Sequence, residues 1–126
     1  MEKHAKAQYE ADQKKFGLTN PYRYIIPRID LHITWLNKLF SAYGLTADEK
    51  TSPIETPDTA LQALKNGRKL EADLAAQYEW LLNNAGDKIT KRVLNTILTQ
   101  TNENLIMFQN DIRILEIEGT MSPLLL

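Results

Sequence analysis

The sequence predicts an all-α fold, an antiparallel four-helix bundle, and three observations support this prediction. No stretch alternates apolar and polar residues over the length of a strand. Apolar residues instead recur at helical spacing in four segments. Gly, Pro, Asn, Asp and Thr, the residues that start and stop helices, separate these segments. Because 126 residues are an ordinary size for one domain, we expect a single four-helix bundle over residues 1–126, with an irregular tail at 119–126.

The first two predicted helices lie between clear breaks. Residues 1–16 contain no internal Gly or Pro and stop at Gly17, which suits a left-handed C-terminal cap. A short turn is expected to begin at Pro21, and Pro27 is expected to restart the chain as the second helix. This helix should end at Gly44.

A long crossing loop, residues 45–55, should separate the second helix from the third, because it mixes polar residues and proline without apolar periodicity. Thr56, followed by Pro and Asp, is expected to cap the third helix, which should reach about residue 84. Gly67 marks a candidate kink or break within it. Asp87 should cap a fourth helix that runs to about residue 116. We expect Gly119 and Pro123 to close that helix. Residues 124–126 form an apolar tail after it.

Composition excludes several classes of function. Fifteen Lys and Arg against sixteen Asp and Glu give a net charge of −1 with scattered basic residues, so we expect no nucleic-acid partner. The absence of cysteine excludes disulfides, thiolate zinc sites and iron–sulfur clusters. No apolar run approaches the roughly 20 residues that span a bilayer, so a soluble, cytoplasmic protein without a membrane partner is expected. Phosphate-binding loops and hydrolase motifs are also missing.

A rotation of about 100° per residue assigns the side chains that face the core of each helix. The expected inward rows are Met1, Ala5, Tyr9 and Phe16, with Glu2 and Asp12 at the margins; Ile25, Ile29, Leu36, Phe40 and Tyr43; Leu61, Leu64, Leu74, Tyr78, Leu81 and Leu82; and Val93, Leu94, Ile97, Leu105, Phe108, Ile112 and Leu115.

Polar side chains interrupt these rows at one level. His32 falls within the second row, Glu71 within the third, and Thr101 and Asn104 within the fourth. Burying a carboxylate without a partner costs several kcal/mol, so Glu71 needs a partner, a proton or a metal ion, and His32 is its expected partner. Three interpretations remain open: a metal or catalytic site, a structural cluster that fixes helix register, or a different helix phase that leaves these residues partly solvated. The structural cluster would consist of His32, Glu71 and Asn104 together with Tyr9 or Tyr78.

A set of residues spread over most of the chain points to a family. They are Glu2-Lys3, Tyr9, Phe16-Gly17, His32, Ala42-Tyr43-Gly44, Leu61-Gln62-Ala63-Leu64, Gly67, Leu70-Glu71, and Asn104-Leu105 with Phe108. In these residues the chain resembles bacterial and archaeal ferritin-like domains of unknown function that are related to the rubrerythrins. The resemblance implies a four-helix bundle whose inward carboxylates and Glu-x-x-His pairs bind two iron ions.

The expected iron ligands are only partly present. The resemblance would place Glu three residues before His32, where this chain has Ile29, and a His near Asn104 on the fourth helix, where Thr101 stands three residues earlier. The surviving ligands are Glu2, His32 and Glu71, about half of the donors that two iron ions require. We therefore expect no working di-iron centre. A single iron or manganese ion could use these three residues, with Asp12 or Glu79 as a further ligand.

Three functions remain open on the sequence alone. The first is a ferritin-like bundle that serves as a structural or interaction module without enzymatic activity. The second is a metal-binding protein or oxidoreductase of rubrerythrin type with one reduced metal site. The third is helix-mediated binding of a protein partner, or homodimerisation, through apolar side chains such as Trp35 and Trp80.

Overall fold

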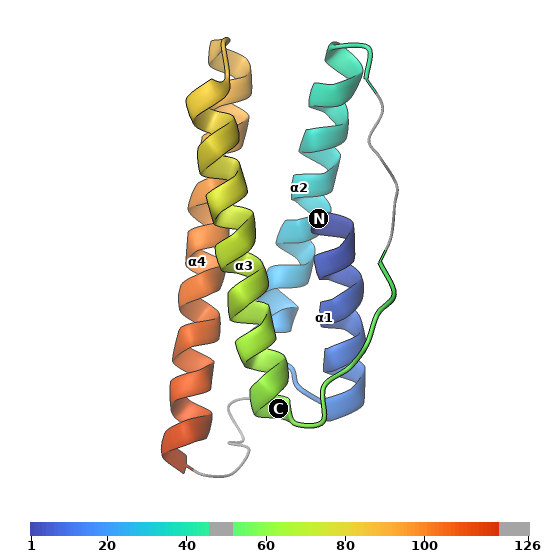
Figure 1. The fold of residues 1–126 in the computed structure, drawn as a ribbon, viewed down its shortest axis with the longest axis vertical. Coiled ribbons are helices and arrows are strands. Elements are labelled where there is room, and N and C mark those ends of the chain that lie inside the picture. Colours follow the sequence, from blue (N-terminus) through green and yellow to red (C-terminus); the bar gives the residue numbers. More distant parts are fainter. Residues whose placement is uncertain (46–51, 119–126) are drawn as a thin grey trace.

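The computed structural model describes residues 1–45 and 52–118 and consists of four helices packed side by side (Figure 1). The helices are α1 (Glu2–Phe16), α2 (Tyr22–Ala42), α3 (Ala60–Asn84) and α4 (Lys88–Glu118). α1 and α2 run antiparallel, and α3 and α4 form a longer antiparallel hairpin; α1 packs against α3, and α2 against α4. Since these residues include no strand, the predicted all-α four-helix bundle is confirmed. Within the same ranges, no helix has the length and apolarity to cross a membrane.

Two of the predicted helix caps are confirmed. Gly17 ends α1 with a φ of 64° and a ψ of 25°, the left-handed conformation that glycine adopts without steric cost. Asp87 precedes α4, and its Oδ1 accepts a hydrogen bond from the Thr90 backbone N–H at 2.8 Å. Two expectations for the end of α4, Gly119 and Pro123, lie outside the described residues, as does the apolar tail at 124–126.

Two other helix starts were predicted wrongly. Thr59, not Thr56, caps α3, and its Oγ1 accepts a hydrogen bond from the Gln62 N–H at 3.1 Å. Thr59 and Gln62 have the Thr-x-x-Gln spacing of a capping box, a stronger local signal than the Thr-Pro pair at 56. Pro27 does not restart the chain but lies inside α2. The helix continues through it because inward side chains on both sides, such as Ile25 and Ile29, are fully buried.

The expected break at Gly67 is absent, and α3 is continuous from Ala60 to Asn84. Gly67 permits a close contact between helices instead. A Cβ atom at this position would lie 2.4 Å from Cε1 and Cζ of the Phe108 ring on α4. The glycine therefore allows the ring to pack directly on the backbone of α3.

An aromatic cluster joins three helices below the middle of the bundle. Tyr9, Tyr22 and Phe108 are all fully buried. Their ring centroids lie 5.4 to 5.8 Å apart, in tilted and edge-on arrangements that aromatic pairs prefer. The remaining apolar core extends above and below this cluster, through Ala5, Leu18, Ile25, Ile29, Leu64, Leu74, Tyr78, Leu94, Ile97, Ile112 and Leu115.

The inward face of α1 is more polar than predicted. Glu2 and Asp12, which the helical rotation placed at the margins, are buried, whereas Met1 is exposed and Phe16 is only half-buried. The apolar row on α1 is short because α1 itself is short. Polar side chains therefore complete the face that it presents to the core.

The helices differ in length, and this leaves one corner of the bundle open. At 1.5 Å per residue, the 15 residues of α1 span about 22 Å and the 25 residues of α3 about 37 Å. The upper part of α2 therefore rises above α1 (Figure 1). Phe40 and Tyr43, predicted to be core residues, are 37% and 59% exposed. Tyr43 reaches the start of α4 through its hydroxyl, which contacts Asp87 and Thr90.

A substitution at Gly67 tests the contact between α3 and α4. Gly67→Ala should lower the free energy of unfolding by about 1–2 kcal/mol, because overpacking against Phe108 costs more than the roughly 1 kcal/mol that alanine adds in helix propensity. The matched control is Gly86→Ala, where an added Cβ meets nothing within 4 Å. Urea denaturation of both variants measures the difference, and equal stabilities would contradict the contact.

Candidate functional site

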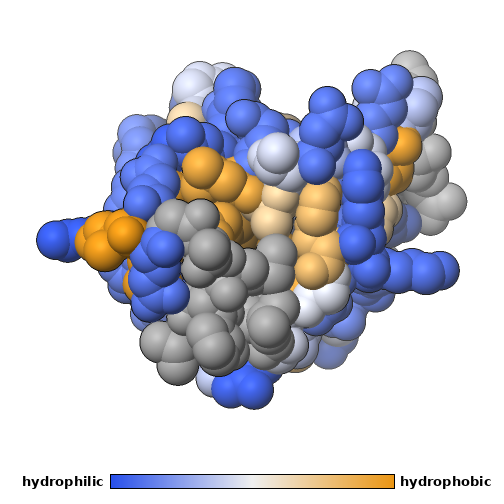
Figure 2. All heavy atoms as spheres, turned by 90° about the horizontal axis from the view of Figure 1, so that it is seen from below, coloured by the Kyte–Doolittle hydropathy of each residue, from blue (hydrophilic) through white to orange (hydrophobic). Residues whose placement is uncertain are grey.

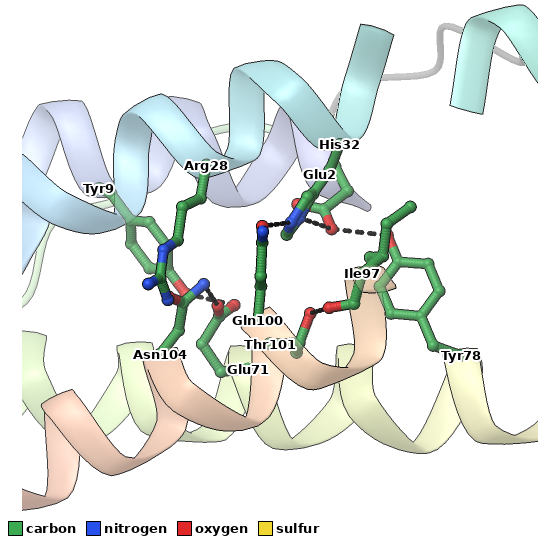
Figure 3. A network of polar contacts seen from close by, with 10 residues as sticks. All are labelled: Glu2, Tyr9, Arg28, His32, Glu71, Tyr78, Ile97, Gln100, Thr101 and Asn104. Atoms are coloured by element: carbon green, nitrogen blue, oxygen red, sulfur yellow. Dashed lines mark hydrogen bonds and ion pairs between the residues drawn. The ribbon is translucent and has the colours of Figure 1, made fainter. Parts of the chain in front are cut away.

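A layer of polar side chains crosses the core of the bundle and receives residues from all four helices (Figure 3). Its buried members are Glu2, His32, Glu71, Thr101 and Asn104, each no more than 5% exposed. The predicted inward positions of His32, Glu71, Thr101 and Asn104 are therefore confirmed. Buried polar groups require hydrogen-bond partners, and these partners define the layer.

One half of the layer is centred on His32 of α2. Its Nδ1 lies 3.2 Å from Oε1 of Glu2, and its Nε2 lies 2.8 Å from Oε1 of Gln100. The Tyr78 hydroxyl donates to the same Glu2 oxygen at 2.5 Å. Both ring nitrogens of His32 therefore have an oxygen partner, so the buried imidazole is fully satisfied. α1, α2, α3 and α4 are joined through these four side chains.

The other half is centred on Glu71 of α3. Its Oε1 accepts a hydrogen bond from Nδ2 of Asn104 at 2.8 Å, and its Oε2 accepts one from the Tyr9 hydroxyl at 3.1 Å. Burial raises the pKa of Glu71 to about 7; the Asn104 hydrogen bond opposes this rise, and the charge of Glu2 adds to it. At neutral pH the Glu71 carboxyl is therefore close to its midpoint of ionisation.

Arg28 connects this half to the surface. One guanidinium nitrogen donates to Oδ1 of Asn104 at 3.1 Å and lies 2.9 Å from Oε2 of Glu103, which is half-exposed. The chain of contacts thus runs from Glu103 through Arg28 and Asn104 to the buried Glu71. Thr101 remains outside this chain, because its hydroxyl donates to the Ile97 carbonyl of its own helix at 2.8 Å.

The predicted partner of Glu71 was wrong. Its hydrogen bonds come from Asn104 and Tyr9, while His32 pairs with Glu2. The charge of His32 still acts on the Glu71 carboxyl, so the two residues belong to the same layer. The pairing was misjudged because the helical rotation placed Glu2 at the margin of α1, whereas the structure buries it.

Two members of the network were not foreseen. Gln100 and Arg28 lie at the edges of their helices and reach the core with long side chains. Arg28 precedes His32 by four residues, so the two side chains share a face of α2, and this spacing is a usable signal. Gln100 carries the same signal, since it precedes Asn104 by four residues on α4.

The three predicted metal ligands face this layer but already have other partners. Oε1 of Glu2 contacts Nδ1 of His32 and accepts a hydrogen bond from the Tyr78 hydroxyl. Oε2 of Glu2 is buried and has no hydrogen-bond partner. Both oxygens of Glu71 accept hydrogen bonds. In the described part of the chain, no group of three or more His, Asp or Glu side chains is placed to hold a metal ion. Of the two further ligands considered, Asp12 is buried and bonded to Gln8, and Glu79 is exposed.

No protein-family model, no curated protein and no solved structure matches this chain. The resemblance to ferritin-like domains therefore stays a prediction that rests on the residues given above. The polar layer has to be interpreted from its own geometry.

The raised pKa of Glu71 predicts how stability depends on pH. The folded protein retains a proton up to about pH 7 that the unfolded chain releases near pH 4.5, so stability should fall as pH rises between these values and level off above them. The decrease should total about 3 kcal/mol, because each tenfold change in proton affinity is worth about 1.4 kcal/mol.

Glu71→Gln provides the matched variant. Its amide can donate to the Tyr9 oxygen and accept from Asn104, while Tyr9 donates to the Gly67 carbonyl 3.3 Å away. Denaturation between pH 4 and 9 should show a weaker pH dependence in the variant than in the wild type. An identical dependence in both would show that Glu71 does not titrate in this range.

Proposed function

We propose that this chain is a helix-binding module, in which a partner helix occupies the open corner of the bundle above α1. The open corner is formed by Asn37 and Phe40 of α2 and by Gln77, Trp80 and Leu81 of α3. The single observation that carries this proposal is the mismatch in helix length. α1 begins at the polar layer, while α2 and α3 extend beyond this level (Figure 1).

On α3, the residues of the open corner continue the strip that faces α1 lower in the bundle. A pocket between α1 and α3 is lined by His4 and Gln8 on one side and by Leu70 and Asp73 on the other. Seven residues later on α3, two helical turns higher, stand Gln77 and Trp80. Trp80 is 64% exposed, so a large aromatic side chain lies at the surface of α3 above the level at which α1 begins.

On α2, the same reasoning applies. Asp30 faces α1, because its carboxylate lies 2.7 Å from Nζ of Lys6. Asn37 stands seven residues after Asp30, and Phe40 stands seven after the half-buried Ile33. The open corner therefore has an apolar side chain on each wall, with an amide beside it.

These walls define the chemistry of the partner. A helix that follows the axis of α1 along residues 33–42 of α2 would need about ten residues, or about 15 Å. It would place apolar side chains at i, i+3, i+4 and i+7 against Phe40, Trp80 and Leu81. Asn37 and Gln77 offer neutral hydrogen bonds at the margins, so binding should depend weakly on salt. Truncation of a buried aromatic side chain at such a surface commonly costs at least tenfold in affinity.

Trp80 supplies the signal for a binding experiment. In a Trp35→Phe background, Trp80 is the remaining tryptophan, and its fluorescence should shift to shorter wavelength when an amphipathic Leu-rich helical peptide covers it. A peptide of the same composition with a scrambled apolar pattern should leave the spectrum unchanged. Phe40→Ser should weaken binding at least tenfold, whereas Ile117→Ser, an exposed apolar site at the other end of α4, should not.

Two results would argue against the partner helix. Equal shifts with both peptides would indicate nonspecific apolar contact. A shift that depends on protein concentration without peptide, together with a doubled mass in light scattering, would assign the open corner to a second copy of the chain.

A single-metal site is the second candidate, and the buried, unpartnered Oε2 of Glu2 favours it. We propose that Glu2, His32 and Glu71 would supply the ligands after exchanging their present hydrogen bonds for a metal ion, since carboxylate and imidazole donors suit iron and manganese. A bound ion would place a positive charge between two buried carboxylates and remove the cost of their burial.

Titration with Fe(II) or Mn(II) tests this second candidate. Binding to the folded state alone should raise the free energy of unfolding by about 2.7 kcal/mol at a metal concentration one hundred times Kd. Glu2→Gln should abolish the increase, and Asp73→Asn, an exposed carboxylate paired with Lys69, should preserve it. No bound metal and no change in melting temperature would remove metal binding as a function.

A further inference from the structure

A second candidate ligand site lies near the lower end of the bundle, the end from which Figure 2 views the molecule, away from both the polar layer and the open corner. A pocket of about 260 Å³ opens between the start of α2 and the lower half of α4. Its lining residues are Asn20, Pro21, Tyr24, Met107, Asn110 and Asp111. This volume exceeds that of a few water molecules and would accommodate a small organic molecule.

Asp111 is the charged group of this pocket. Its carboxylate is half-buried, and among the described residues it makes no hydrogen bond and no ion pair. Burial raises the pKa of Asp111 to about 6. At neutral pH the carboxylate is therefore mostly charged, although it lacks the partner that such a group normally has.

The side chains nearby do not satisfy Asp111. The charge of Asp111 acts on the Tyr22 hydroxyl, which is completely buried and has no hydrogen-bond partner of its own. Arg23 does not contact Asp111, since its guanidinium donates to the Tyr24 hydroxyl and its central carbon lies 4.6 Å from the centre of the Tyr24 ring. The pocket thus holds an acceptor that its own neighbours leave without a donor.

The other walls restrict what could supply that donor. Tyr24, Met107 and Pro21 present apolar surface, and the amides of Asn20 and Asn110 are uncharged. A hard metal ion needs several anionic oxygens, and the pocket lining contains a single carboxylate. A positively charged nitrogen on a short apolar stem fits better: the nitrogen would pair with the carboxylate, and the stem would lie against the apolar walls.

We propose that this pocket binds small organic ammonium ions, with Asp111 as the countercharge and Tyr24 and Met107 as the apolar wall. The bound nitrogen donates to the Asp111 carboxylate and to the neighbouring amide oxygens. The ligand is identified by its chemistry, a primary ammonium group with an aliphatic chain of a few carbons. This site is independent of the proposed helix binding, because it shares no residue with the open corner.

NMR titration with n-butylammonium chloride tests the proposal, with n-butanol as the uncharged analogue and sodium chloride as the control for ionic strength. The backbone amide signals of Asn110 and Asp111 should shift and saturate with a Kd in the millimolar range, as expected for a ligand of so few atoms. n-Butanol and sodium chloride should produce at most small, unsaturated shifts. The affinity should decrease as pH falls through about 6, where Asp111 takes up a proton.

Asp111→Asn keeps the shape of the side chain and removes its charge. It should weaken n-butylammonium binding at least tenfold while the melting temperature stays the same or rises, because burial no longer opposes a charge at this position. Asp73→Asn, which changes a carboxylate on α3, should bind n-butylammonium as the wild type does. Saturable binding that survives Asp111→Asn, equal binding of n-butanol, or no saturable shift at tens of millimolar would each overturn the proposal.

Discussion

The buried contact between Glu2 and His32, joined by the Tyr78 hydroxyl, is the constraint on which the rest of the structure depends. A buried carboxylate and a buried imidazole are costly unless each is fully satisfied, so the helices that carry them are held in one register. α1 cannot shift by one turn without breaking the contacts of Glu2 with both His32 and Tyr78. The same contact fixes the level at which α1 begins, and the beginning of α1 in turn sets the height of the open corner. A structural contact in the core therefore determines where the surface of the bundle is incomplete.

The fold was largely predictable because its signals are local and periodic. Apolar spacing gave the four helices, Gly17 and Asp87 gave two of their ends, and rotation along each helix placed His32, Glu71 and Asn104 inside. The misjudged positions share a physical cause, namely that tertiary contacts override local preferences. Pro27 is tolerated because buried neighbours hold α2 together. Gly67, which locally indicates a break, is explained only by the Phe108 ring on another helix.

The candidate site was predictable in its members but not in its pairings. Which carboxylate meets His32 depends on the relative height of α1, and no residue of α1 reports that height. The exposure of Phe40 was missed for the same reason, since helical periodicity describes the faces of one helix and not the length of its neighbour. Gln100 and Arg28 reach the core from positions that the rotation assigns to the edge, because long side chains can extend past their own backbone.

The connection before α3 has a consequence for how α1 is retained. Gln8 donates to the Glu55 carbonyl at 2.8 Å, and Lys15 donates to the Pro57 carbonyl at 2.7 Å, so the chain leading into α3 is fastened along the outside of α1. α1 is thus held between residues 55–57 of this connection on its outer side and the polar layer on its inner side. Its retention does not rely on a broad apolar face, which it lacks. Detachment of α1 would have to break its hydrogen bonds with residues 55–57 and its core contacts together. The shortest helix is therefore expected to unfold cooperatively with the bundle instead of fraying on its own.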